Sequence, residues 1–65
     1  MQDRTYTARV KHHTTERLLV RSDGTAYHVG RHVMPISRKL AAITLLNMIR
    51  ASRNRPDIYG PVVRS

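Results

Sequence analysis

Histidines and carboxylates are the side chains of this sequence that could act in catalysis or bind a metal. Their spacing predicts neither a catalytic site nor a metal site. The four histidines are His12, His13, His28 and His32. His28 and His32 are four residues apart, but they fall in a predicted strand and in the segment after it, not on a helix where i, i+4 ligands share a face, and the chain has no cysteine. The four carboxylates are Asp3, Glu16, Asp23 and Asp57, scattered over ends and turns. With no paired acid and base, we expect no catalysis, no metal and no cofactor.

Positive charge is the strongest functional signal. Twelve Lys and Arg residues stand against four Asp and Glu, giving a formal net charge of +8. Ten of the twelve are Arg, whose planar guanidinium makes bidentate contacts to phosphate or carboxylate. This balance predicts a polyanionic partner, either nucleic acid or an acidic protein surface.

Alternating residues predict three strands that would position these cations. In residues 5–12, Tyr6, Ala8 and Val10 point one way while Arg9 and Lys11 point the other. Strands are also expected at about residues 16–22 and 25–30, joined by Asp23-Gly24. This dipeptide predicts a two-residue type I′ hairpin loop.

Strand register then decides which side chains share a face. A two-residue loop at 23–24 pairs Val20 with Tyr27 and Leu18 with Val29, while a three-residue loop at 13–15 pairs Val10 with Leu18. This register keeps most of the apolar residues on the core side, including both strand tyrosines, and leaves Leu19 and Ala26 on the outer face. The outer face then carries cations and no acidic residue, so it is the predicted binding surface. Its members are Arg9, Lys11, Arg17, Arg21 and His28, extended by Arg31, Arg38 and Lys39 from the following segments.

The most apolar segment predicts one long helix over about residues 35–53. Pro35 suits a first helical position, and Asn54 followed by Pro56 indicates the end of the helix. At 100° per residue, Ile36, Leu40 and Ile43 share one face, which we expect to pack on the sheet. The apolar surface is wider than one stripe, so a second flank must also be covered.

The covering of that flank is open from the sequence. The C-terminal residues 56–65 contain two prolines and a glycine, yet are too apolar for a free tail. They should lie extended on the helix, on the sheet edge or on another subunit. We favour a homodimer, because so small a domain needs additional burial. The residues assigned to this interface are Leu45, Met48, Ile49, Ile58, Tyr59 and Val62.

Together these elements predict a single α+β domain over residues 1–65, with a three-stranded antiparallel sheet, one helix and an extended C-terminal segment. The longest apolar run is too short to span a bilayer. The first residues lack the apolar region of a signal peptide, so the expected location is cytoplasmic.

The β-β-β-α order with a basic sheet resembles the N-terminal DNA-binding domains of phage-type tyrosine integrases. The resemblance covers about residues 5–53 and consists of element order and charge. We expect a small basic protein that binds nucleic acid as a phage or mobile-element accessory or regulatory factor. Duplex DNA is favoured because no exposed aromatic remains for base stacking. The alternative is an inhibitor or adapter on an acidic face of a polymerase, nuclease or defence complex.

Overall fold

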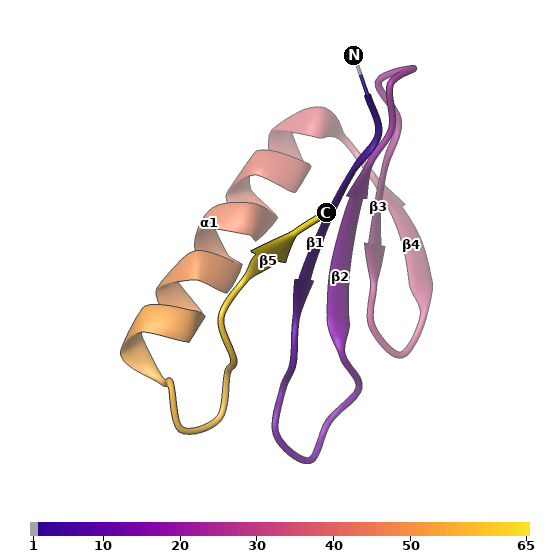
Figure 1. Ribbon diagram of the computed structural model, residues 1–65. Helices are drawn as coiled ribbons and strands as arrows, with labels where there is room; N and C mark the ends of the chain where they lie inside the picture. Colours follow the sequence, from indigo (N-terminus) through magenta and orange to yellow (C-terminus); the bar gives the residue numbers. More distant parts are fainter. Residues whose placement is uncertain (1) are drawn as a thin grey trace.

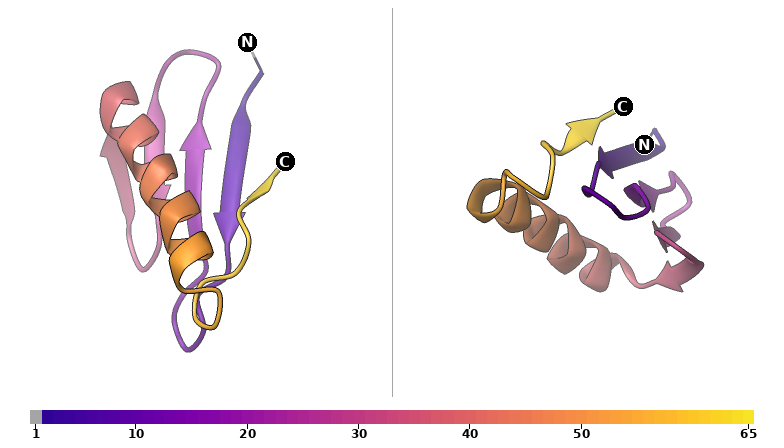
Figure 2. Two further views of the ribbon diagram at one scale, coloured as in Figure 1. Left: turned by 90° about the vertical axis from the view of Figure 1, so that its left-hand side faces the viewer. Right: turned by 90° about the horizontal axis from the view of Figure 1, so that it is seen from below.

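One helix packs on a five-stranded antiparallel sheet (Figure 1). The computed structural model describes residues 2–65. Its elements are β1 (Arg4–Ala8), β2 (Glu16–Val20), β3 (Ala26–Val29), β4 (Val33–Ile36), α1 (Arg38–Asn54) and β5 (Val63–Arg64). The strand order is β4-β3-β2-β1-β5, and α1 lies across one face of the sheet (Figure 2). The α+β class is confirmed, whereas the prediction of three strands is wrong.

The fourth strand includes Pro35 and Ile36, which were predicted to begin the helix. Pro35 lies opposite Tyr27 in the β3–β4 ladder, not at the start of the helix. Proline is tolerated there because β4 is an edge strand of the sheet. Ser37 caps the helix instead, since its side-chain oxygen accepts a hydrogen bond from the Leu40 amide at 3.1 Å. The 17-residue helix therefore begins at Arg38.

The β2–β3 loop is one residue longer than predicted. Arg21 and Thr25 close it through an N–H to O=C bond of 2.8 Å, and Gly24 has φ 93°. The Asp23 carboxylate accepts from the Thr25 amide at 3.0 Å and from its hydroxyl at 2.6 Å. These bonds lower the pKa of Asp23 below its usual value. Only the glycine then needs a positive φ, whereas a type I′ turn would have required it of Asp23 as well.

This extra residue turns β3 over. Leu18 pairs with His28 and Leu19 pairs with Tyr27, so Ala26 and His28 face the helix. Tyr27 and Val29 face outwards, opposite to the prediction, because a slip of one residue exchanges the two faces of a strand.

The β1–β2 ladder is shifted as well, but by an even number of residues. Tyr6 lies opposite Leu18 and Ala8 opposite Glu16, where the predicted register paired Val10 with Leu18. The connecting loop therefore spans residues 9–15. Because an even shift leaves the faces unchanged, Tyr6, Ala8 and Leu18 face the helix as expected.

The core is small and lies between the helix and the middle of the sheet. Its fully buried residues are Ala8, Leu18, Ala26, Ala41 and Met48. Leu40 and Ile43, predicted to face the sheet, are each 45% exposed. The helix is apolar around most of its circumference, so periodicity could not select the buried face. Three of the five buried residues are alanines, Ala8 and Ala26 on the sheet and Ala41 on the helix.

The C-terminal segment lies along the free edge of β1. Tyr6 pairs with Arg64 and Thr7 with Val63, while Val10 forms an isolated bridge with Tyr59. Of the three predicted placements, the sheet edge is confirmed. Tyr59 and Val62 also pack against the core, so this segment covers one flank of the helix.

Candidate nucleic-acid interface

The predicted basic sheet face does not form. The outer face of the sheet, opposite the helix, carries mostly apolar and hydroxyl side chains, with Val33 66% exposed and Val63 59% exposed. Its strand residues are Thr5, Thr7, Arg17, Leu19, Tyr27, Val29, Val33, Pro35 and Val63. Arg17 is the one predicted contact that lies within a strand on this face. In the β1–β2 ladder Arg17 lies opposite Thr7.

His28 lies on the helix side and is engaged by a carboxylate. Its Nε2 is 3.0 Å from Oε1 of Glu16, and the Tyr59 hydroxyl donates to the other carboxylate oxygen. Burial, together with this bond to Glu16, raises the pKa of Tyr59 above its ordinary value. Sequence reasoning missed this cluster because Glu16 and Tyr59 are 43 residues apart. His28 therefore lies on the helix side of the sheet, beside Glu16, and not on the outer face where it was predicted.

Basic residues gather instead at one end of the sheet, which we call the loop end. It consists of the β1–β2 loop (residues 9–15) and the β3–β4 loop (residues 30–32). The two loops project from the same end of the sheet (Figure 1). The C-terminal end of α1 lies at this end too (Figure 2). All the basic side chains of the loop end are exposed: Arg9, Lys11, His12, His13, Arg31 and His32.

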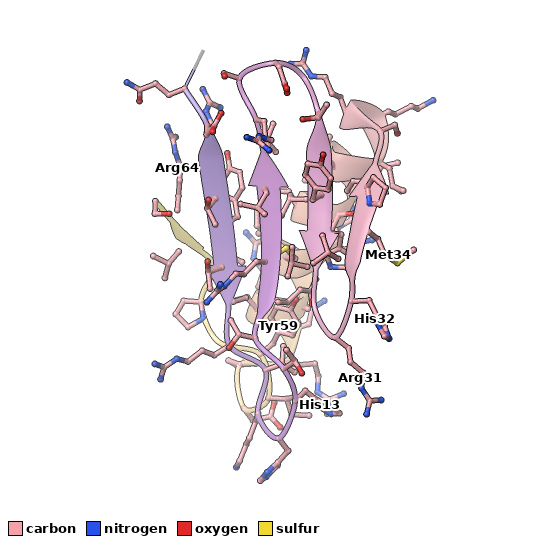
Figure 3. All side chains as sticks on the ribbon, turned by 90° about the vertical axis from the view of Figure 1, so that its right-hand side faces the viewer. His13, Arg31, His32, Met34, Tyr59 and Arg64 are labelled. Atoms are coloured by element: carbon pink, nitrogen blue, oxygen red, sulfur yellow. The ribbon has the colours of Figure 1, made fainter. Side chains whose placement is uncertain are left out.

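Two shallow hollows flank the tip of the β1–β2 loop. His12, His13, Thr14 and Arg31 line the first, which lies between the two loops. Figure 3 shows His13 and Arg31 at this end of the sheet, with His32 in the same loop as Arg31. The second hollow opens towards the segment after the helix and includes Arg9, Lys11, His13 and Asp57 in its lining. His13 thus borders both hollows.

The C-terminal segment braces the β1–β2 loop. The Lys11 amide donates to the carbonyl of Ile58 at 2.8 Å, and the Gly60 amide donates to the carbonyl of Arg9 at 2.7 Å. The chains are so close that a Cβ at Gly60 would lie 3.3 Å from the Arg9 oxygen. The cations of this loop are therefore held by backbone bonds from a distant part of the chain.

The other predicted cations lie at the opposite end of the sheet. Arg21 belongs to the β2–β3 turn, and Arg38 and Lys39 lie in the first turn of α1. A Cβ at Gly24 would be 3.9 Å from Cδ of Arg38, so the turn and the helix start are neighbours. Two exposed carboxylates share this end. Asp23 lies in the turn itself, and Asp3 accepts from the Ser22 amide at 2.6 Å.

Few of the cations are neutralised within the chain. Among residues 2–65, Asp57 forms an ion pair with Arg55 at 3.8 Å, and Glu16 lies 3.0 Å from Nε2 of His28. Arg9, Lys11 and Arg31 form none with any described carboxylate. Because Glu16 is half-buried and engaged by Tyr59 and His28, it does not offset the exposed positive charge of the loop end.

The predicted oligomer surface is mostly part of the core. Met48 is 1% exposed, and Leu45, Tyr59 and Val62 pack against the buried residues, while Ile58 is half-buried. Of the predicted set, Ile49 is the exposed large side chain, at 40%. The uncovered apolar helix face is a different one, formed by Leu40, Ile43 and Leu46.

The described residues contain no cluster of three or more potential metal ligands. No helix within residues 2–65 has the length and apolar character needed to cross a membrane. Comparisons of the chain with protein-family models, curated proteins and solved structures gave no match. Function is therefore inferred from the chain's own geometry and charge.

Proposed function

We propose that this protein binds nucleic acid, duplex DNA in particular, as a small accessory or regulatory factor of phage or mobile-element type. The observation that carries the proposal is the loop end, where Arg9, Lys11 and Arg31 are exposed and unpaired with any described carboxylate. Cations that neutralise phosphates release condensed counterions, which drives binding without sequence specificity. The opposite end is less suited to a polyanion, because two carboxylates, Asp3 and Asp23, are exposed there, whereas Asp57, the exposed carboxylate beside the loop end, lies 3.8 Å from Arg55.

The shape of the loop end favours a duplex over unpaired strands. The β1–β2 hairpin projects from the sheet (Figure 1), and Lys11, His12 and His13 are exposed in its loop. A major groove about 12 Å wide admits a two-stranded ribbon of this kind. Unpaired bases stack best on the large rings of tyrosine, phenylalanine and tryptophan, and none of these lines either hollow at the loop end. The half-buried Tyr27 lies on the outer sheet face, away from these cations.

A pair of charge-matched variants tests the proposal. One changes Arg9, Lys11 and Arg31 to Ala, and the other changes Arg21, Arg38 and Lys39 to Ala at the opposite end. Affinities for a duplex and for a single strand of the same sequence are measured at low and at moderate salt. We expect preference for the duplex and a steep fall of affinity with salt. The loop-end variant should bind about tenfold more weakly or worse, and its salt slope should fall by roughly 0.9 for each phosphate that is no longer neutralised.

Three results would contradict this proposal. Absence of duplex binding at low salt would exclude the function. An equal loss of affinity in the opposite-end variant would show that the loop end is not the interface. Stronger binding to the single strand, abolished by Tyr27→Ala, would place the interface on the outer face of the sheet.

The uncovered apolar helix face favours a second candidate, an adapter or inhibitor that docks on an acidic protein surface. Leu40 and Ile43 are each 45% exposed and Leu46 is 55% exposed, and Arg50 is exposed on the same helix. Protein interfaces combine such apolar patches with arginine. This function predicts a partner that is retained after nuclease treatment and released on Leu46→Gln. The nucleic-acid function instead predicts that nuclease removes whatever the wild type captures.

A further inference from the structure

The hollow between the two loops has the lining of an anion site. It is bordered by two imidazoles, a hydroxyl and a guanidinium, from His12, His13, Thr14 and Arg31, and by no carboxylate. Arg31 can present several N–H donors in one plane, and the hydroxyl and the ring N–H groups can each add one. A group with several acceptor oxygens matches this set better than a cation does.

The backbone at His12 points to a role for its side chain. The His13 amide donates to the Val10 carbonyl at 3.0 Å, closing a turn in which His12 has φ 63°. It is the one non-glycine residue of the described chain with positive φ. Glycine would adopt this conformation without steric cost. The conformation of the turn therefore does not require the imidazole of His12. Residues with sparsely populated backbone conformations cluster at functional sites.

Both walls of the hollow are held in place. Lys11, the residue before His12, is bonded through its amide to the Ile58 carbonyl at 2.8 Å. On the other wall, the Gly30 amide donates to the carbonyl of His32 at 3.1 Å, which closes the loop around Arg31. The donors therefore lie on short, braced turns, so less conformational freedom is lost when a ligand binds.

We propose that this hollow binds one phosphate group of the nucleic-acid backbone, a claim that rests on the proposed function. Arg31 contacts the phosphate through its guanidinium, while His12, His13 and Thr14 donate from the opposite wall. The contact fixes the position of the β1–β2 hairpin on the duplex and carries no sequence information, as is general for phosphate contacts.

Single variants with matched controls test the site. His12→Gly, His13→Ala and Arg31→Ala alter the lining. The controls are Arg21→Ala, exposed in the β2–β3 turn at the opposite end of the sheet, and Arg50→Ala, exposed on α1. Duplex affinity is measured against salt for each. We expect Arg31→Ala to reduce affinity about tenfold and the salt slope by about one unit, with the controls changing affinity by less than about twofold. His12→Gly should bind more weakly while its denaturation midpoint stays equal or rises, which separates binding from folding.

A second measurement separates this site from the function on which it rests. Inorganic phosphate is titrated into the wild type while backbone amide shifts are followed, with chloride at the same ionic strength as reference. If the wild type binds duplex and the three lining variants behave like the controls, the site is wrong and the function stands. If no duplex binds but phosphate changes the backbone amide shifts of residues 12–14 and 31, the hollow binds free phosphate and only the nucleic-acid function is wrong. If neither happens, both are wrong.

Discussion

The hydroxyl of Tyr59 donates a hydrogen bond to the carboxylate of Glu16, 43 residues earlier in the chain. His28 approaches the other oxygen of the same carboxylate at 3.0 Å. This cluster joins the C-terminal segment to β2 and β3 directly behind the loop end. It also engages the one carboxylate that belongs to a strand, which keeps the exposed surface of the loop end basic.

Tyr59→Phe should lower the free energy of unfolding by about 1 kcal/mol, since it removes a hydrogen bond to a charged group that is partly exposed. The raised pKa of Tyr59 gives this bond a pH dependence. Its contribution is complete below the ordinary tyrosine value of 10.0 and is lost as the pH rises above it. Denaturant unfolding at neutral and alkaline pH measures both effects, with Tyr27→Phe as the control. If the free energy of unfolding fell by the same amount at alkaline pH in Tyr59→Phe and in the wild type, the pH dependence would not come from Tyr59.

Ala26→Val tests the strand register by the sign of its effect. Ala26 is 2% exposed against the helix, so two added methyl groups should overpack the core and cost about 1–3 kcal/mol. In the register with a two-residue loop, residue 26 would face outwards, and valine would be neutral or stabilising there. Thermal unfolding measures the change. Tyr27→Thr, on the outer face, is the comparison and should cost less than Ala26→Val.

Met48→Ala and Leu46→Ala test which side of the helix is buried. Met48 is 1% exposed, so its truncation should cost about 2–4 kcal/mol. Leu46 is 55% exposed, and its truncation should cost less than about 1 kcal/mol. Urea denaturation of the two variants gives the difference. A larger destabilisation by Leu46→Ala would mean that a second subunit covers that face, and the effect would then depend on protein concentration.

Gly60→Ala should loosen the brace on the β1–β2 loop, because the added Cβ would lie 3.3 Å from the Arg9 carbonyl oxygen. We expect a destabilisation of about 1 kcal/mol and faster hydrogen exchange at the Lys11 amide, which bonds to Ile58. Gly30→Ala is the matched control, since a Cβ there meets nothing within 4 Å. Equal exchange at Lys11 in the two variants would show that the C-terminal segment does not hold the loop.

The sequence by itself determined the element types along most of the chain, because those depend on local patterns. Alternation placed Tyr6, Ala8 and Leu18 on the core side, and that assignment survives a shifted register because an even slip preserves the faces. The long apolar run also predicted the helix, with its stop close to Asn54. The composition alone supplied the net charge that motivates a polyanionic partner.

Tertiary structure decided where the charges lie. Asp23 bonded to Thr25 instead of entering a type I′ turn, and one added loop residue moved Tyr27 outwards and His28 inwards. Pro35 joined an edge strand, and an almost uniformly apolar helix turned Met48 to the sheet and left Leu40 exposed. These choices depend on packing and on bonds between distant residues, such as Lys11 to Ile58, which no local pattern encodes. Chain pairing thereby assembled the cations at the loop end, where a strand-by-strand interpretation had spread them over a sheet face.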